Sequence, residues 1–449
     1  MRFVILLLAL SVAACGPKKP GADDDDDGDG GSEPDACVGL ECQVVNCAAM
    51  GMPPTTITGT VYAPNGTLPL NGVNVYVPRD PLPLPPFTEG ASCDRCALLP
   101  GGPVAQVISG ENGSFTLENV PAGANVPIVI TTGKWRRVVT LSNVNQCTDN
   151  VVTVEQSRLP KTKAEGDIPK IALTTGGADS LECLVRKLGV DDTEISTNAG
   201  TGRVNFFVGD ESAFDAVGQF QPGHPGGPGQ TFPAASGLWD SADKLKVYDI
   251  VFLSCEGSQN EGSKPQPSID AMKAYADLGG RVFASHWHNI WIGGNYTGDN
   301  NPSPAVWRDI AEWNGGSNLG GTIYIDEAAN PKGTAFANWM VNVGGSTTRG
   351  EIVLQSGTGR LTASSVDPLM GEQWVRTSNN NPQMFQFTTP NEQPLDQRCG
   401  KVVFTDMHVS GDPADSGRFP DCGGNTLTPQ EKALAFMFFD IASCVGGID

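Results

Sequence analysis

The chain has 449 residues, a formal net charge of −21 at pH 7 and only 18% charged residues. This length allows two or three domains with an ample core. The acidic surface should repel nucleic acid, and the sequence holds no basic cluster of the kind that follows a phosphate backbone, so we expect no nucleic-acid partner. The 55 glycines and 34 prolines indicate a loop-rich chain outside the cytoplasm.

The N-terminal segment is typical of a targeting signal. Residues 3–12 form an apolar run, too short to span a bilayer, that leads through small residues to Cys15. This pattern resembles a bacterial lipoprotein signal, and an ordinary secretory signal with a chance cysteine is the alternative. The resemblance implies a signal peptide over residues 1–14 and a lipid anchor on Cys15. Because Gly16 and not aspartate follows, it also implies the outer membrane, on its periplasmic face or at the cell surface.

Residues 15–54 are expected to form a lipidated tether. Five aspartates from Asp23 to Asp27 stand in a Gly-rich block that cannot bury enough apolar area to fold. The tether ends in a cluster of three cysteines, at positions 37, 42 and 47.

Most of the 12 cysteines should form disulfides in an oxidising compartment. Without Cys15 the remaining number is odd, so one thiol should be free or intermolecular. We expect Cys255 to pair with a neighbour such as Cys183, and the other pairings stay open.

Residues 55–159 read as an all-β domain. Short alternating strands are predicted at residues 56–62, 72–77, 104–108, 114–117, 126–131 and 135–141, separated by Asn-Gly and Pro-Gly turns. Residues 57–61, 72–75 and 113–123 resemble the carboxypeptidase regulatory-like (transthyretin-like) module. That resemblance implies a seven-stranded prealbumin-like sandwich, with residues 78–103 as an insertion.

Residues 160–449 follow a different pattern, in which strands alternate with helices as in a parallel sheet. Strands are predicted at residues 170–174, 203–208, 248–253, 281–284 and 401–405, and helices at residues 179–188, 268–278 and 428–443. The last helix starts with the capping box Thr428-Pro-Gln-Glu431. Residues 289–398 are less regular and are expected to add strands and loops.

Three of the four histidines follow apolar runs in this second domain: His286 and His288 end one motif, and His408 ends another. The order of elements resembles the class I glutamine amidotransferase-like superfamily, closest to its trehalose-utilisation (ThuA-like) branch. Ala284-Ser285-His286 stands where amidotransferases have Gly-x-Cys. The resemblance implies a three-layer α/β, flavodoxin-like domain with a mostly parallel sheet. It also implies that glutamine hydrolysis is lost, because this reaction needs a thiolate where His286 stands.

Ligands of open α/β sheets bind at the carboxyl ends of the strands, so the histidine motifs predict a site. His286 and His408 are the candidate catalytic groups. The candidate ligand-binding residues are Cys255, Glu256, Ser285, Trp287, His288, Trp291 and Asp406. His286 and His288 would point the same way if the strand continued that far.

Three interpretations of this site stay open. The first is a metal held by His286, His288 and His408 with Asp406 or Glu256. The second is a pocket for an organic ligand, with tryptophans such as Trp287 and Trp291 stacking on sugar rings. The third is a set of hydrogen-bonded, inert histidines, with the tryptophans packed in the core. No resident cofactor is expected.

The sequence therefore favours an envelope lipoprotein that binds a glycan or another small ligand without amidotransferase chemistry. One alternative is a hydrolase or lyase of a sugar derivative with His286 and His408 as acid and base. Another is a structural or adhesive surface protein with a degenerate site.

Overall fold

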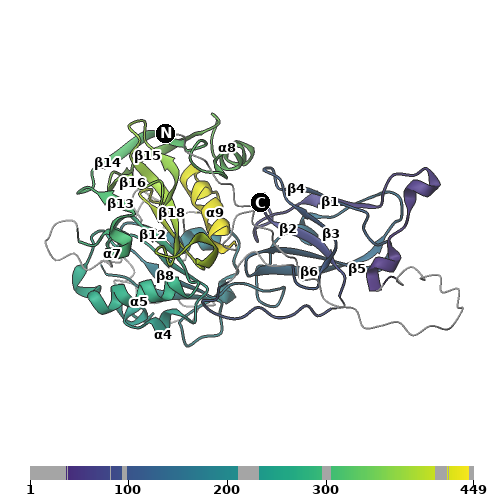
Figure 1. Ribbon diagram of the computed structural model, residues 1–449, viewed down its shortest axis with the longest axis horizontal. Coiled ribbons are helices and arrows are strands. Elements are labelled where there is room, and N and C mark those ends of the chain that lie inside the picture. The colour runs from purple at the N-terminus through teal and green to yellow at the C-terminus, as the bar shows by residue number, and fades with distance from the viewer. Residues whose placement is uncertain are drawn as a thin grey trace, which may run out of the picture. The chain divides into compact units, whose positions relative to one another are not determined.

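The computed structural model of the protein describes residues 37, 39–80, 82–93, 99–210, 232–295, 305–409, 422 and 424–443 (Figure 1). Cys15 and the expected signal and lipid anchor lie outside these residues. From Gly39 onward the described residues belong to one compact unit. No described helix has the length and apolar character needed to cross a membrane.

Two short 3-10 helices precede the first strand, η1 (Gly39–Gln43) and η2 (Cys47–Met50). Both fall in the segment expected as the end of the tether. Cys47 is buried and forms a disulfide with Cys147 on the β-domain, and Cys37 and Cys42 are also disulfide-bonded. The Cys47–Cys147 disulfide therefore fastens the segment around η2 to the first domain.

Seven strands form the first domain, in two sheets with the orders β4-β1-β7 and β3-β2-β5-β6. They are β1 (Thr56–Thr60), β2 (Asn74–Pro78), β3 (Pro103–Ile108), β4 (Ser114–Glu118), β5 (Gly123–Thr132), β6 (Trp135–Val144) and β7 (Asp149–Val151). Inward side chains of both sheets, such as Ile57 and Ile128, share one core. The six predicted strands are confirmed, and β7 was missed because three residues are too short to show an alternating pattern.

The insertion at residues 78–103 packs against the second domain. The Ala91 amide donates a hydrogen bond to the Lys246 carbonyl at 2.8 Å, and Cys93 forms a disulfide with Cys399. Gly90 permits this close approach, because a Cβ there would lie 2.2 Å from the Lys246 oxygen. The insertion thus ties the two domains together.

The second domain is built on one ten-stranded sheet with the order β15-β14-β17-β18-β19-β12-β11-β8-β10-β9. The six strands from β19 to β9 are parallel: β8 (Ile171–Thr175), β9 (Ile195–Ser196), β10 (Val204–Val208), β11 (Ile250–Leu253), β12 (Arg281–Ser285) and β19 (Gly400–Thr405). These agree with the predicted strands, apart from the two-residue β9.

The other four strands are antiparallel, so the sheet is mixed to a greater degree than expected. They are β14 (Asn318–Ile325), β15 (Glu351–Arg360), β17 (Glu372–Arg376) and β18 (Pro382–Thr389). A separate pair joins β13 (Ala311–Trp313) to β16 (Ala363–Val366). All six come from the irregular region at residues 289–398, where additional strands were expected.

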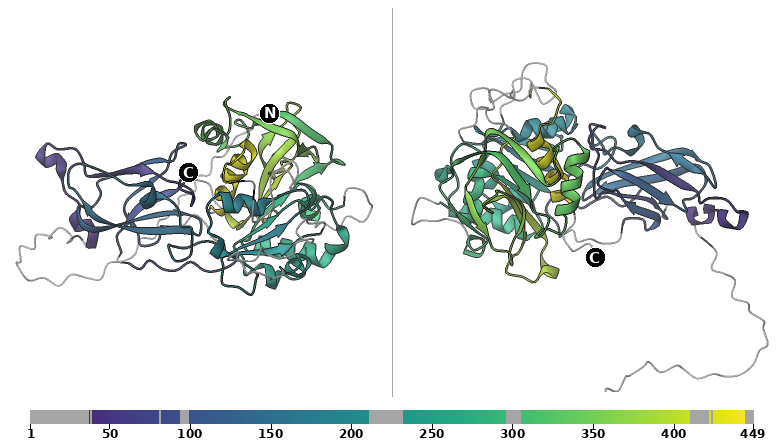
Figure 2. Two further views of the ribbon diagram at one scale, coloured as in Figure 1. Left: turned by 180° about the vertical axis from the view of Figure 1, so that it is seen from behind. Right: turned by 90° about the horizontal axis from the view of Figure 1, so that it is seen from above.

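Helices cover both faces of the parallel half of the sheet (Figure 2). On β11, Ile250 and Phe252 face the core that contains α2 (Leu181–Lys187) and α9 (Pro429–Ala442). Val251 and Leu253 face the opposite core, which contains α5 (Gln266–Asp277). Because successive side chains on a strand point to opposite faces, this apolar run produces three layers.

The helix ends follow local chemistry. Thr428 caps α9 as predicted, with its hydroxyl accepting a hydrogen bond from the Glu431 amide and the Glu431 carboxylate returning to the cap. Helix α5 starts two residues before the predicted first residue, Ser268, because Pro267 fits the first helical turn, where its missing N–H is not needed.

The remaining helices are short. They are α1 (Val154–Ser157), α3 (Ser236–Trp239), α4 (Ala242–Leu245), α6 (Ile290–Gly293), α7 (Ala305–Arg308), α8 (Gly333–Asn342), η3 (Asp192–Glu194), η4 (Glu261–Ser263), η5 (His286–Asn289) and η6 (Leu395–Gln397).

The predicted pairing of Cys183 with Cys255 is wrong. Cys183, on α2, forms a disulfide with Cys422, and Cys255 is the free cysteine among the described residues. Cys255 stands at a strand end, whereas Cys183 packs in the core that α2 helps to form.

Replacing both Cys93 and Cys399 by serine should lower the free energy of unfolding by about 2–4 kcal/mol, because the cross-link closes a very long loop. Urea unfolding followed by circular dichroism measures this difference. An unchanged midpoint would mean that the cross-link does not hold the domains together.

Candidate functional site

Three neighbouring parallel strands bring the candidate site together at their carboxyl ends. Leu253 of β11 is paired with Ala284 of β12, so the positions two residues further on, Cys255 and His286, lie at the same level. On the other side, Ser285 is paired with Thr405 of β19, and His408 follows three residues later. The register of these strands therefore explains why residues far apart in the sequence meet.

His286 stands on the sharp turn that ends β12. Its φ is +42°, in the left-handed region that side chains other than glycine seldom adopt. A conformation of this kind costs about 1–3 kcal/mol and is typical of functional sites. The strand ends at Ser285 and η5 begins at His286, so the turn redirects the imidazole towards the neighbouring strand ends.

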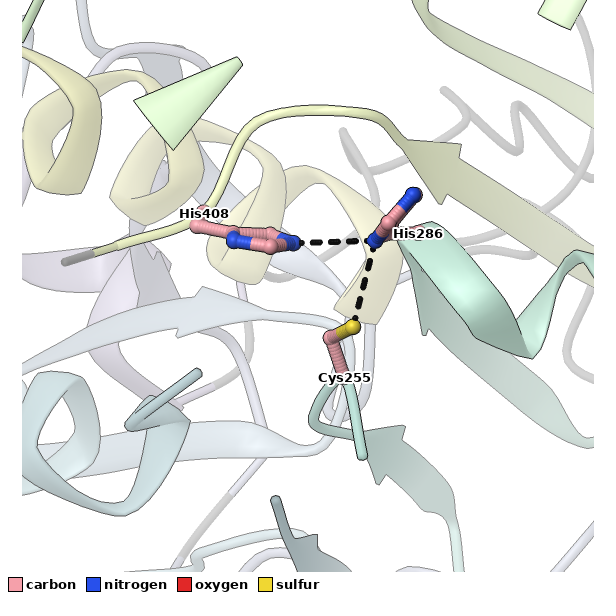
Figure 3. A group of neighbouring side chains, drawn as sticks. All are labelled: Cys255, His286 and His408. Carbon is pink, nitrogen blue, oxygen red and sulfur yellow. Dashed lines mark hydrogen bonds between the residues drawn. The ribbon is translucent and has the colours of Figure 1, made fainter. Parts of the chain in front are cut away.

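The side chains of Cys255, His286 and His408 form a buried cluster (Figure 3). His286 Nδ1 lies 3.3 Å from Cys255 Sγ and 3.2 Å from His408 Nε2. All three ligand atoms lie within 4.8 Å of one another. The side chains are at most 2% exposed. The expected meeting of His286 and His408 is confirmed, and Cys255 joins them.

Asp179, which precedes α2, connects the three strand ends. Its carboxylate accepts hydrogen bonds from the Ser285 hydroxyl at 2.6 Å and from the Val409 amide at 2.9 Å. The Cys255 amide also donates to it. Each donor is a cluster residue or its direct neighbour in the chain, so one buried carboxylate fixes all three strand ends. Burial raises the pKa of this carboxyl to about 6 against the lowering effect of these bonds.

Burial also sets the protonation of the cluster. Desolvation lowers the pKa of His408 to about 3 and that of His286 well below its ordinary value, with the charge of Arg360 adding to both effects. Desolvation raises the pKa of the Cys255 thiol to about 12. At neutral pH the cluster therefore consists of two neutral imidazoles and a protonated thiol.

The second ring nitrogen of His286 lies beside a position without a side chain. A Cβ at Gly316 would lie 3.5 Å from His286 Nε2 and 3.3 Å from Thr362 Oγ1. Nε2 itself has no hydrogen-bond partner among the described residues. Half-buried Trp287 borders this position, with its ring centroid 4.5 Å from that of His286.

Arg360, at the end of β15, supplies a positive charge that acts on all three cluster residues. Its guanidinium donates to the carbonyls of Gly357 and Gly359. It forms no ion pair within the described part of the chain. An anionic group that reached the cluster would find its counter-charge here.

His288 does not join the cluster. Its Nε2 lies 2.9 Å from the Ser254 carbonyl oxygen, and its Nδ1 accepts a hydrogen bond from Trp291 Nε1 at 3.0 Å. The condition for His286 and His288 to point the same way is not met, because the strand ends before either residue. Trp291 is a core residue.

The other candidate residues are held by internal partners. Glu256 forms a buried ion pair with Lys264 at 2.6 Å, and Asp406 accepts hydrogen bonds from the Thr362 and Ala363 amides. Ser285 donates to Asp179. Neither carboxylate lies in the Cys255–His286–His408 cluster, so the structure does not support their predicted part in a metal site.

Sequence reasoning missed two residues of this site. Asp179 was interpreted only as the start of a helix, although a carboxylate four residues after the end of a parallel strand is also placed to reach neighbouring strand ends. Arg360 comes from the irregular region, where no pattern marked it.

The chain was compared with protein families, curated proteins and solved structures. No protein family pattern matches the chain, and no curated protein matches it. Two crystal structures of interface mutants of a type II cohesin–X-dockerin complex from Acetivibrio cellulolyticus are similar at 15% and 16% identity. They cover 33% of this chain and 78–79% of the matched chains, with a TM-score of 0.15.

Asp179→Ala should lower the free energy of unfolding by about 3 kcal/mol, because it leaves several buried donors without an acceptor. Chemical denaturation measures the loss. The matched control is Asp191→Ala, which removes a carboxylate that accepts local hydrogen bonds at an exposed turn and should cost much less. Equal losses would contradict the organising role of Asp179.

Glu182 predicts a pH dependence of stability. Its side chain is buried, and desolvation, with Asp179 adding to it, raises its pKa from 4.5 to about 8. Because the folded-state pKa is the higher one, the stabilising contribution is present below pH 4.5 and is lost as the pH rises through 8. Glu182→Gln removes this loss. At pH 9 the free energy of unfolding of the Glu182→Gln variant should exceed that of the original chain by several kcal/mol, because each unit of pKa shift corresponds to about 1.4 kcal/mol. At pH 4.5 the variant should not be the more stable protein. A difference that is the same at both pH values would contradict the assignment.

Proposed function

We propose that this chain is a lipid-anchored protein of the bacterial envelope whose α/β domain binds a small ligand at the carboxyl ends of β11, β12 and β19. The observation that carries the proposal is the positive-φ turn at His286, which points an imidazole at Cys255 and His408. Backbone strain and buried polar atoms without partners lower the stability of the fold, and such features are typical of functional sites.

The strand order supports an amidotransferase-like scaffold for this domain. Numbered along the chain, the main parallel strands β8, β10, β11, β12 and β19 lie in the order 2-1-3-4-5, which is the flavodoxin-like order. The prealbumin-like assignment of the first domain is proposed on its seven strands in two sheets.

The site favours binding over glutamine hydrolysis. The turn residue is a histidine, and the nearby Cys255 carries a thiol whose raised pKa leaves little thiolate at neutral pH. The border of the site suits a small polar ligand with a negative group, because Trp287 offers a partly exposed ring and Arg360 a positive charge. Sugar acids and sugar phosphates have this chemistry.

A thermal-shift screen of the purified full chain tests this proposal. Sugar acids or sugar phosphates should raise the melting temperature in a saturable way, since they bind only the folded chain. Arg360→Ala should weaken the apparent affinity about tenfold or more, whereas Arg79→Ala, an arginine of the β-domain paired with Glu41, should leave it unchanged. A screen without any saturable shift would favour a structural or adhesive protein with a degenerate site.

A sugar-derivative hydrolase or lyase is the second candidate, and the 3.2 Å contact between the two imidazoles favours it. His408 Nε2–H donating to His286 Nδ1 would orient His286 to exchange a proton at Nε2. Turnover of a ligand found in the screen, lost in both His286→Asn and His408→Asn, would support this function over binding alone.

The envelope location has its own test. Cys15→Ser should remove metabolic labelling with radioactive palmitate and release the protein from the membrane fraction, because the lipid on Cys15 is the proposed anchor. Labelling that persists in this variant would rule out Cys15 as the anchor.

A further inference from the structure

The contacts inside the Cys255–His286–His408 cluster are not satisfied by hydrogen bonds alone. His286 Nδ1 is the common partner of Cys255 Sγ and His408 Nε2, yet a ring nitrogen offers either one proton or one lone pair. The outer nitrogens, His286 Nε2 and His408 Nδ1, are buried without a hydrogen-bond partner among the described residues. The five polar atoms of the cluster are therefore not all satisfied by hydrogen bonds among the described residues.

One cation between the three ligand atoms resolves the convergence. Zinc binds imidazole nitrogen at about 2.0–2.1 Å and thiolate sulfur at about 2.3 Å, in tetrahedral geometry. These bond lengths separate two nitrogen ligands by about 3.4 Å and a nitrogen from a sulfur by about 3.6 Å. The observed separations of 3.2 and 3.3 Å are close to these values.

The surroundings of the sulfur also fit a bound metal. The backbone N–H groups of Trp287 and Gly257 donate to Cys255 Sγ, as donors commonly do around metal-bound thiolates. Asp179 holds the backbone on either side of the cluster, so the ligands are fixed before any ion enters. His288 gives the contrast within the same turn, because both of its nitrogens are already bonded.

We infer that Cys255 Sγ, His286 Nδ1 and His408 Nε2 form a binding site for one zinc-type divalent transition-metal ion. Two imidazoles and one thiolate are the ligand types that such borderline ions prefer. On binding, the Cys255 thiol loses one proton to solvent and its sulfur bonds to the metal. Three protein ligands leave one coordination position open for water or a ligand group.

The inference rests on the proposed function, since it names an ion as the ligand, or as part of the ligand, of that same site. Arg360 then has a defined role. An anion bound at the open coordination position would be neutralised by both the metal and this guanidinium.

Metal analysis of the purified full chain tests the inference. The protein is stripped with a chelator, without reductant so that the disulfides stay closed, then dialysed against zinc with excess magnesium and calcium. The bound metal is measured by mass spectrometry. We expect one equivalent of zinc. Replacing zinc by cobalt should give the visible and near-ultraviolet absorption of a tetrahedral site with a thiolate ligand.

Three variants locate the ion. Cys255→Ser and His408→Asn should each lower zinc affinity at least tenfold, and Cys255→Ser should also remove the thiolate-to-cobalt absorption. His288→Gln is the matched control and should keep one equivalent. Circular dichroism verifies folding, and if His408→Asn does not fold, the near-isosteric Cys255→Ser decides. Less than 0.1 equivalent in the original chain, or unchanged binding in Cys255→Ser, would overturn the inference.

The thermal-shift screen separates this failure from that of the proposed function. If the chain binds no zinc in the metal analysis but a sugar acid or sugar phosphate still stabilises it, the metal site is contradicted and ligand binding is supported. If neither zinc nor an organic ligand binds, both proposals fail.

Discussion

The buried carboxylate of Asp179 is the constraint on which the site depends. It accepts hydrogen bonds from the Cys255 amide, the Ser285 hydroxyl and the Val409 amide, and so joins the ends of β11, β12 and β19. A buried carboxylate is costly unless several donors surround it. The same donors fix the backbone of a turn that is strained at His286. Without this acceptor, the three strand ends would keep their ladder hydrogen bonds and the contacts of the two histidines, but no single group would bond to all three.

The strand register, the turn at His286 and burial together determine the chemical state of the cluster. The strand register places Cys255 level with His286, the positive φ turns the imidazole inward, and burial keeps both histidines neutral. A neutral imidazole ligates metals, whereas an imidazolium does not. The Cys255 thiol differs from the two imidazoles, because it must lose its proton before its sulfur can bind a metal ion. The cluster is thus better arranged to hold a ligand than to attack one.

The histidines that mark this site were visible in the sequence, and so was the meeting of His286 with His408, because both follow buried parallel strands. The place of His288 was not predictable in the same way, since it depends on the strand ending at Ser285. Cys255 was assigned to a disulfide, because spacing alone does not reveal that Cys183, on α2, pairs with Cys422. Arg360 came from a region without periodic pattern, so its approach to the cluster depends on long-range pairing of antiparallel strands.

At the level of the two domains, too, local elements were predictable from the sequence and long-range contacts were not. Alternation and turn residues predicted six strands of the sandwich, but not that residues 78–103 would reach the α/β domain and be cross-linked to Cys399. Local patterns carry information about local elements, whereas the junction and the site arise from contacts between residues 31 to 306 positions apart in the sequence.

A crystal structure of the full chain grown with zinc, with anomalous diffraction recorded on both sides of the zinc absorption edge, would show whether the cluster holds the ion. We expect one strong anomalous peak within bonding distance of Cys255 Sγ, His286 Nδ1 and His408 Nε2, with Asp179 still bonded to the neighbouring backbone. The absence of a peak there, with the two imidazoles turned apart, would contradict the metal site.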